Sequence, residues 1–126
     1  MASTERWHAL FAAVDAKNTR EFLSFLTPDA FFRYGSNVPA TGHDAIGAVV
    51  DRFFDSIRVS EHRIQRVWEQ PDSAVVQGEV AYVRLDGRAV ILPFCNVFVL
   101  RGEKIERYEI YIDPAPLFTL APTNPN

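Results

Sequence analysis

Residues 73–101 read SAVVQGEVAYVRLDGRAVILPFCNVFVLR, two long runs rich in Val, Tyr and Phe that meet at Asp86-Gly87. Asp-Gly between two such runs is the strongest short-range signal for a β-hairpin. Pro71-Asp72 precedes the first run and Gly102-Glu103 follows the second, so turn signals recur at nearly even spacing. The sequence therefore predicts a meander of four antiparallel strands, over residues 59–70, 73–85, 88–101 and 104–113.

The first half of the chain has helical spacing instead. Apolar residues stand at positions 7, 10, 11 and 14, and again at 22, 25 and 26 before Pro28 stops the second helix. A third apolar stripe runs from Ile46 to Ile57, and Thr41 with Asp44 is expected to cap its first turn. A short strand over residues 30–34 precedes it. Helices followed by a meander predict an α+β domain, with a curved antiparallel sheet packed against three N-terminal helices.

The composition is that of one globular domain, which we place at residues 1–113. The 126 residues are 48% hydrophobic and 13% aromatic, with ten Phe, and a surplus of aromatic residues is typical of a ligand cavity. Residues 114–126 form a Pro-rich C-terminal tail that is expected to contain neither helix nor central strand.

Several classes of function are not expected. The net charge is −3 and no basic run occurs, which argues against nucleic-acid binding. The single cysteine, Cys95, cannot form an internal disulfide, and the polar N-terminus and absence of a long apolar run predict a cytoplasmic protein without membrane contact. The three histidines have no metal-ligand spacing, and no cofactor fingerprint is present, so neither metal nor cofactor is expected.

The hairpins predict which side chains face the core. If both hairpin turns contain two residues, Glu79 pairs with Phe94 and Trp68 pairs with Val75, and cross-strand partners share a face. The predicted inner face then comprises His62, Ile64, Arg66, Trp68, Val75, Gln77, Glu79, Ala81, Val83, Val90, Leu92, Phe94, Asn96 and Phe98. The last strand has two possible registers, and we favour a three-residue turn with a bulge, which places Tyr108, Ile110 and Ile112 inward. Polar groups on an otherwise apolar face indicate a pocket.

Five short segments resemble the NTF2-like superfamily, within it the SnoaL-like polyketide cyclases, limonene-epoxide hydrolase and ketosteroid isomerase. These segments are Val14-Asp15, Pro28-Asp29-Ala30, Gly42-His43-Asp44-Ala45-Ile46, Gly102-Glu103-Lys104-Ile105 and Tyr111-Ile112-Asp113-Pro114. The resemblance covers nearly the whole chain and implies a cone-shaped fold that encloses one pocket. Because members include enzymes, binding proteins and dimerising modules, the fold leaves the activity open.

The family's active-site residues match this sequence only in part. The acidic residue of the hydrolase and the cyclases falls at Ile110, and the hydrolase's tyrosine and asparagine fall at Phe32 and Tyr34. The isomerase's tyrosine and base fall at Leu10 and Arg33, and its oxyanion-binding acid falls near Asn96. A pocket histidine of scytalone dehydratase, another member, falls at His62.

The candidate catalytic residues are His62 and Glu79 for proton transfer and Asn96 for polarising an oxygen. The candidate substrate-binding residues are Phe32, Tyr34, Arg66, Trp68, Phe94, Tyr108 and Ile110. One hypothesis is cofactor-independent acid–base catalysis, of the lyase, isomerase, cyclase or epoxide-hydrolase type, on a small, mostly apolar, oxygen-bearing molecule. The alternative is a ligand-binding or dimerisation domain without catalysis. In either case a homodimer is expected through the outer sheet face, which is predicted to carry Val67, Val76, Val80 and Tyr82.

Overall fold

The computed structural model describes residues 3–119. Over this range the helices are α1 (Ser3–Asp15), α2 (Thr19–Ser24), α3 (His43–Asp55) and α4 (Ala115–Phe118). The strands are β1 (Leu26–Tyr34), β2 (Ala40–Thr41), β3 (Ile57–Gln70), β4 (Ser73–Arg84), β5 (Ala89–Arg101) and β6 (Lys104–Tyr111). The predicted α+β architecture, with three helices before a β-meander, is confirmed.

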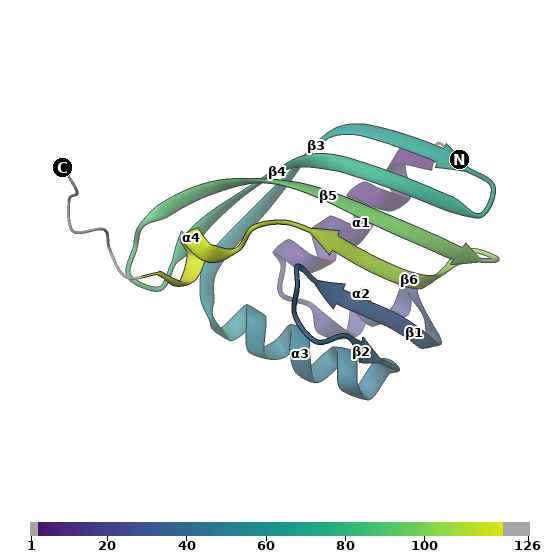
Figure 1. Ribbon diagram of the computed structural model, residues 1–126, viewed down its shortest axis with the longest axis horizontal. Helices are drawn as coiled ribbons and strands as arrows, with labels where there is room; N and C mark the ends of the chain where they lie inside the picture. Colours follow the sequence, from purple (N-terminus) through teal and green to yellow (C-terminus); the bar gives the residue numbers. More distant parts are fainter. Residues whose placement is uncertain (1–2, 120–126) are drawn as a thin grey trace.

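The strands form one curved sheet in the order β2-β1-β6-β5-β4-β3. Every neighbouring pair is antiparallel except β1 and β6, which run parallel. Helices α1, α2 and α3 lie on the concave side of this sheet, and α4 lies near the turn between β4 and β5 (Figure 1). The core fills the space between the sheet and the three N-terminal helices, with Trp7, Leu10, Ile46 and Phe98 among its most buried side chains.

Two predicted boundaries differ from the observed ones. The second helix ends at Ser24, and β1 begins at Leu26 and continues through Pro28. The expected Thr41–Asp44 capping box is wrong, because Thr41 belongs to β2 and Gly42 is the N-cap of α3, without a side-chain hydrogen bond. Gly42 has φ of 88°, a backbone conformation that residues other than glycine rarely adopt. This conformation lets the chain turn into α3.

The hairpin between β4 and β5 has a longer turn than expected. Arg84 N donates to Arg88 O at 2.8 Å, so three residues form the loop, and Gly87 takes φ of 90° within it. The extra residue shifts β4 by one position, and Gly78 rather than Glu79 lies opposite Phe94. A shift of one residue reverses the facing of every side chain in a strand. The expected inward facing of Val75, Gln77, Glu79, Ala81 and Val83 is therefore wrong.

Because β3 contains a β-bulge, the predicted facing is right for the residues before the bulge and wrong for those after it. Its pairing with β4 gains one residue between Ile64, opposite Gly78, and Arg66, opposite Gln77. A Cβ on Gly78 would lie 2.1 Å from the carbonyl oxygen of Arg63, so the bulge needs glycine at this position. Before the bulge, His62 and Ile64 face inward as expected. After it, Arg66 and Trp68 face outward, which corrects the prediction for both.

The preferred facing of β6 is observed, although the turn differs. Arg101 pairs with Lys104 across a two-residue turn. The pairing then passes over Glu106 on β6, since Leu100 pairs with Ile105 and Val99 with Arg107. This irregularity turns Tyr108 and Ile110 toward the cavity and leaves Glu109 on the outer face. Apolar burial thus decided the register, as the sequence indicated, but through a bulge after the turn.

The start of the Pro-rich tail contains a helix, contrary to expectation. In α4 (Ala115–Phe118) Pro116 occupies the first turn, where its missing N–H would have no helical partner in any case. Leu117 is buried, and Arg84 Nη1 donates to Pro116 O at 2.9 Å. Pro122 and Pro125 lie outside the described residues, and the boundary at residue 113 stays a prediction. None of the helices within residues 3–119 is long and apolar enough to cross a membrane.

Candidate functional site

A cavity of about 320 Å³ lies between α3 and the concave face of the sheet. Its aromatic wall comprises Phe22, Phe32, Phe53, Phe54, Phe94 and Phe118. Its aliphatic wall comprises Val14, Val49, Val50, Val80, Ile110 and Ile112. Its polar groups are Tyr34, Asn37, Arg52, Ser56, His62, Tyr82, Asn96 and Tyr108. Among residues 3–119 the lining contains no carboxylate.

His62 is held by Asp15, the last residue of α1. His62 Nδ1 lies 2.6 Å from Asp15 Oδ1, and the backbone N of His62 donates to Asp15 Oδ2 at 2.8 Å. Ser60 Oγ donates to Asp15 Oδ1 at 2.8 Å. Since an ionised carboxylate only accepts hydrogen bonds, Nδ1 must carry the proton, which leaves the lone pair of neutral His62 on Nε2.

Aromatic rings fix the plane of the imidazole. Phe11 stacks on His62 with 4.7 Å between ring centroids and 5° between planes, and Phe94 meets it edge-on at 5.3 Å. The His62 side chain is only 11% exposed and lines the cavity. Held on one edge by Asp15 and on one face by Phe11, the ring has a single orientation, and its unpaired edge is available to a ligand.

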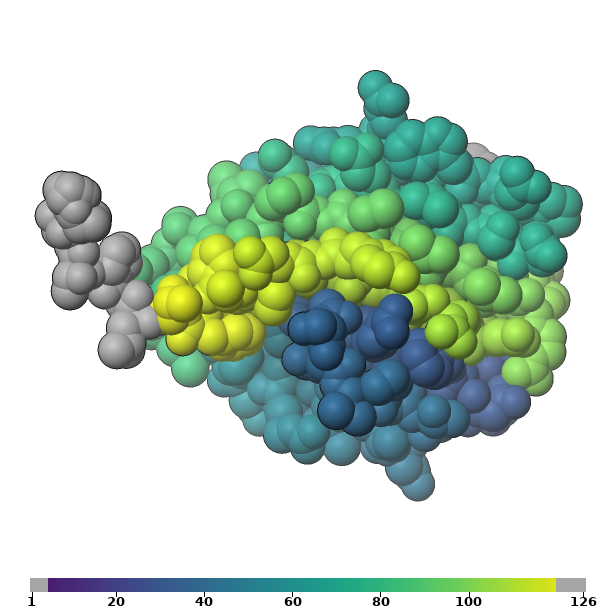
Figure 2. Space-filling view, viewed as in Figure 1, coloured from purple at the N-terminus to yellow at the C-terminus, as the bar shows by residue number. Residues whose placement is uncertain are grey.

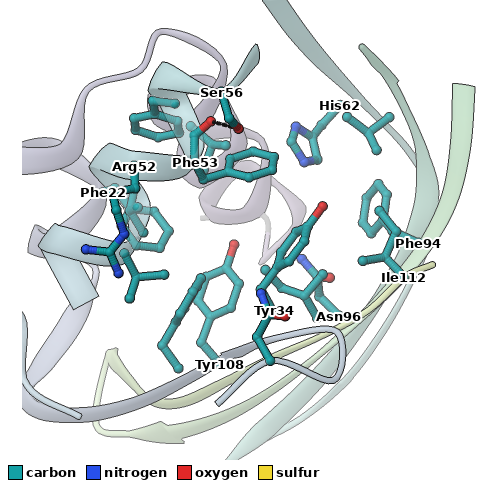
Figure 3. A pocket seen from close by; sticks show the side chains of 18 of the residues that line it. Phe22, Tyr34, Arg52, Phe53, Ser56, His62, Phe94, Asn96, Tyr108 and Ile112 are labelled. Carbon is teal, nitrogen blue, oxygen red and sulfur yellow. Dashed lines mark hydrogen bonds between the residues drawn. The ribbon is translucent and has the colours of Figure 1, made fainter. Parts of the chain in front are cut away.

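Three tyrosine hydroxyls converge on the same space. Figure 3 shows the hydroxyls of Tyr34 and Tyr108 directed into the cavity, with that of Tyr34 nearer to His62 in this view. Burial raises the pKa of Tyr34 to about 12. The pKa of Tyr82 is raised by more than that of Tyr34, mainly by burial and secondly by the nearby Tyr34. Burial also raises the pKa of Tyr108. All three phenols are therefore neutral hydrogen-bond donors at ordinary pH.

Two buried polar atoms at the cavity have no hydrogen-bond partner within the described chain. One is the Tyr34 hydroxyl; Tyr82 is near enough to influence its titration but does not meet it in hydrogen-bonding geometry. The other is Oδ1 of Asn96, a residue that is 2% exposed. Leaving such a group unpaired costs about 1–3 kcal/mol, so both atoms indicate a polar ligand or ordered water in the cavity.

The mouth of the cavity is formed by residues from three segments. Asn37 comes from the loop after β1, Arg52 and Ser56 come from the C-terminal end of α3, and Phe118 comes from α4. Arg52 is exposed and makes no ion pair with any residue between 3 and 119. Figure 2 shows α4 and β6 as a continuous yellow band beside the blue segment of β1 and β2.

The structure brings together seven of the ten candidate residues named from the sequence. His62, Asn96, Phe32, Tyr34, Phe94, Tyr108 and Ile110 all line the cavity. The other three do not. Glu79 lies on the outer face, opposite Pro93. Arg66 and Trp68 come after the bulge in β3 and lie on the same outer face, where Trp68 is 50% exposed. Each of the three was displaced by the one-residue shift in β4 or by the bulge in β3.

Sequence reasoning missed Asn37, Arg52 and Ser56, which line the cavity, and it also missed Tyr82 and Asp15. Tyr82 was expected on the outer face but is buried and lines the cavity, because of the same shift in β4. Asp15 had been recognised only as a family-typical helix end. A signal was available, since a carboxylate in the last turn of a helix is disfavoured by the helix dipole and no basic residue accompanies it. An acid in that position needs a partner elsewhere in the fold.

The arrangement is suited to proton transfer in a mainly apolar cavity. One oriented imidazole can accept or return a proton, and the phenols and Asn96 can donate hydrogen bonds to an oxygen. Within the described chain, no group of three or more His, Cys, Asp or Glu side chains is placed to hold a metal ion.

The sequence and the fold both have recognisable relatives. The family model of the SnoaL-like domain matches residues 7–108. No curated protein matches the sequence significantly. An NTF2-like protein of unknown function from Burkholderia pseudomallei superposes with a TM-score of 0.84 at 18% identity, covering 92% of this chain and 96% of the other.

Two further solved structures share the fold. TerC, co-crystallized with polyporic acid, gives a TM-score of 0.78 at 22% identity over 90% of this chain and 92% of its own. An LEH-like epoxide hydrolase from M. tuberculosis gives a TM-score of 0.72 at 16% identity over 88% of this chain and 82% of its own. At these identities the similarity establishes the NTF2-like fold and no activity.

Proposed function

This chain belongs to the SnoaL-like domain family, and on that premise we propose that its cavity is the active site of a cofactor-independent acid–base enzyme. The substrate is a small, mostly apolar molecule that carries oxygen. The reaction is proton abstraction from a carbon next to a carbonyl group, followed by isomerisation or elimination. The observation that carries the proposal is the hydrogen bond between Asp15 and His62, which directs one imidazole edge into an apolar cavity.

His62 is the proton carrier in this mechanism. Its Nε2 lone pair accepts the proton from carbon, and the imidazolium that forms is stabilised by the adjacent Asp15 carboxylate. Removing the proton moves negative charge onto the carbonyl oxygen. Tyr34, Tyr108 and Asn96 supply hydrogen-bond donors to that oxygen, which are worth more where water is excluded. His62 then returns the proton at a second position or to a leaving hydroxyl group.

The size and shape of the cavity limit the substrate. A volume of about 320 Å³ lies at the small end of ligand pockets, which span about 300–1,000 Å³. That space accommodates one ring or two fused rings. Because the walls are mainly Phe, Val and Ile, the substrate is apolar apart from its oxygen atoms.

The test is exchange of carbon-bound protons in heavy water. We expect the protein to accelerate exchange of the protons next to the carbonyl group of 2-tetralone, followed by proton NMR. The His62→Gln variant should lose about 10²–10⁴-fold of this acceleration. The matched control is His8→Gln, an exposed histidine on α1 outside the cavity. Exchange at the buffer rate, or exchange unaffected by His62→Gln, contradicts the proposal.

A non-catalytic binding function is the second candidate, and one residue favours it. Ile110 lines the cavity at the position where the resemblance places the acidic residue of the cyclases and the epoxide hydrolase. In that case His62 and the tyrosines only orient a bound molecule. A ligand that binds without exchange or turnover in the wild-type protein would support this alternative.

We also propose a homodimer through the outer sheet face. All four residues expected there face the core instead: Val76, Val80 and Tyr82 are buried, and Val67, which pairs with Val76, packs against the core. Within residues 3–119, the large exposed apolar side chains on this face are Val59, Trp68, Ile91 and Tyr111. Trp68→Lys should weaken the dimer in sedimentation velocity relative to Arg63→Lys, a conservative change on the same face. A wild-type monomer at micromolar concentration contradicts this proposal.

A further inference from the structure

A surface groove lies beside the mouth of the cavity, beyond the ends of β1 and β6. Its lining includes Arg33, Val38 and Tyr111. Asn37 and Ile112 line both the groove and the cavity, so the two hollows adjoin. A molecule that fills the cavity and extends past its mouth therefore enters the groove.

The boundary between the two hollows is a loop over residues 35–39 that is held to β6. Gly35 N donates to Ile110 O at 2.9 Å, and Asn37 N donates to Tyr34 O at 3.1 Å. Gly35 takes φ of 59°, and a Cβ there would lie 3.4 Å from the carbonyl oxygen of Ile112. The loop belongs to the blue segment that Figure 2 shows against the yellow band of β6 and α4. Because backbone contacts hold the loop, the groove is formed before a ligand arrives.

The charges behind the groove do not balance. Glu109 pairs with two guanidinium groups, Arg33 at Oε1 and Arg107 at Oε2, the latter at 2.7 Å. The Tyr111 hydroxyl also donates to Oε1 at 3.2 Å, so both oxygens of Glu109 are occupied. One carboxylate neutralises one of the two arginines and leaves one positive charge in excess. Within residues 3–119, the lining of the groove contains no carboxylate that could balance it.

Arg33 presents this charge to the groove. Its contact with Glu109 uses Nη2, and its side chain is 33% exposed, so further N–H groups remain for a ligand. The buried Glu109 carboxylate also holds the guanidinium in place, which reduces the entropy lost when a ligand binds. Arg107 points elsewhere, since its guanidinium lies 4.0 Å from the centroid of the Phe31 ring.

We propose that the groove is a second binding subsite, which takes a carboxylate-bearing tail of the ligand whose ring lies in the cavity. The tail passes Asn37, its methylene groups lie against Val38 and Tyr111, and its carboxylate pairs with Arg33. Val38 is 88% exposed and Tyr111 is 51% exposed, so the tail removes apolar surface from water. This inference rests on the function proposed above for the cavity, and it names the substrate class as a ring ketone with a flexible acid chain.

The test compares three naphthalene compounds, whose two fused rings suit the cavity, by isothermal titration calorimetry at pH 7. The compounds are 5-(2-naphthyl)pentanoate, its methyl ester, and 2-naphthoate, whose carboxylate cannot reach the groove. The protein is used in the oligomeric state that it has in solution. We expect the pentanoate to bind about fivefold more tightly than its ester, because a partly exposed ion pair contributes modestly. We also expect it to bind more tightly than 2-naphthoate.

A matched pair of variants assigns the preference to one arginine. Arg33→Gln and Arg107→Gln each remove one positive charge beside Glu109, but the groove loses a lining side chain in Arg33→Gln. Arg33→Gln should abolish the preference for the pentanoate over the ester, and Arg107→Gln should retain most of it. Binding of the ester shows that each variant is folded.

A further variant tests the passage without changing an ion pair. Asn37→Phe adds a large side chain at an exposed loop position between the two hollows. It should weaken binding of the pentanoate several-fold and leave binding of 2-naphthoate unchanged.

Several results would overturn the proposal. They are equal binding of the pentanoate and its ester, binding of 2-naphthoate as tight as that of the pentanoate, binding of none of the three, and equal loss of preference in the two arginine variants. Unchanged preference in Arg33→Gln would do so as well, as expected if the carboxylate paired with Arg52 at the mouth.

Failure of this proposal is distinguishable from failure of the proposed reaction. A protein that exchanges 2-tetralone protons through His62 but does not prefer the pentanoate retains the reaction and loses the subsite. A protein that prefers the pentanoate through Arg33 but exchanges no proton of 2-tetralone retains the subsite and loses the reaction.

Discussion

Asp15 Oδ1 and His62 Nδ1 lie 2.6 Å apart although 47 positions separate the two residues in the sequence. The contact joins the C-terminal end of α1 to the middle of β3, and the backbone N of His62 and the hydroxyl of Ser60 complete the environment of the carboxylate. This pair orients the only imidazole that lines the cavity within the described residues. The predictions below start from it.

Asp15→Asn should reduce the rate of proton exchange by about 10²-fold or more, because an amide cannot accept from all three donors on β3 and fix the tautomer of His62. The free energy of unfolding should fall by about 1–3 kcal/mol, since a buried donor loses its acceptor. Exchange of 2-tetralone and urea denaturation measure the two effects. The control is Asp44→Asn, an exposed carboxylate in the first turn of α3. Equal loss in both variants would contradict the prediction.

Tyr34→Phe should change stability and function in opposite directions. The variant removes a buried hydroxyl that has no hydrogen-bond partner, so the free energy of unfolding should stay level or rise by about 1 kcal/mol. Proton exchange should slow, because the oxyanion loses a donor. Urea denaturation and the exchange assay are the measurements. Tyr111→Phe, which alters an exposed tyrosine, is the comparison; a destabilised Tyr34→Phe protein would show that this hydroxyl is satisfied in solution.

Glu109 should contribute to stability at neutral pH and lose that contribution in acid. The hydrogen bond from Arg107, with the nearby Arg33, holds the pKa of its carboxyl below the ordinary 4.5. A carboxyl whose pKa is lower in the folded state stabilises the fold above its unfolded pKa, and the effect disappears as pH falls through the folded pKa. The thermal unfolding temperature of Glu109→Gln should therefore lie below that of wild type at pH 7, and the difference should shrink as the pH falls progressively below 4.5. A constant difference across this range would refute it.

Gly78→Ala should be among the most destabilising single substitutions on the sheet, at about 3 kcal/mol or more. The added Cβ would lie 2.1 Å from the carbonyl oxygen of Arg63. Residues 63 and 78 lie in paired strands, so neither backbone can move away without disturbing the sheet. Gly47→Ala is the matched control: its Cβ would meet only the ends of two side chains, Leu23 at 3.4 Å and Thr19 at 3.8 Å, and alanine favours the helix. Urea denaturation of both variants decides the point, and a Gly78→Ala protein as stable as Gly47→Ala would contradict the bulge geometry.

Prediction from the sequence was most accurate where a single strand or helix held the answer. The cavity residues Phe94, Asn96, Tyr108 and Ile110 followed from alternation along β5 and β6. The error at Glu79 arose between strands, because a three-residue loop replaced the expected two-residue turn. His62 faces inward because the bulge at Ile64 and Arg66 compensates for that shift.

By itself the sequence determined the α+β class, the order of the elements, the ends of most strands and the apolar face of each helix. These features depend on local periodicity and turn residues, which are read along one segment at a time. Only the tertiary structure decided which face of β4 meets the cavity, where β3 bulges, and that Asp15 meets His62. Those outcomes depend on how segments pack against each other, since one added residue in a loop or bulge reverses a strand's facing, and packing of the core selects the arrangement.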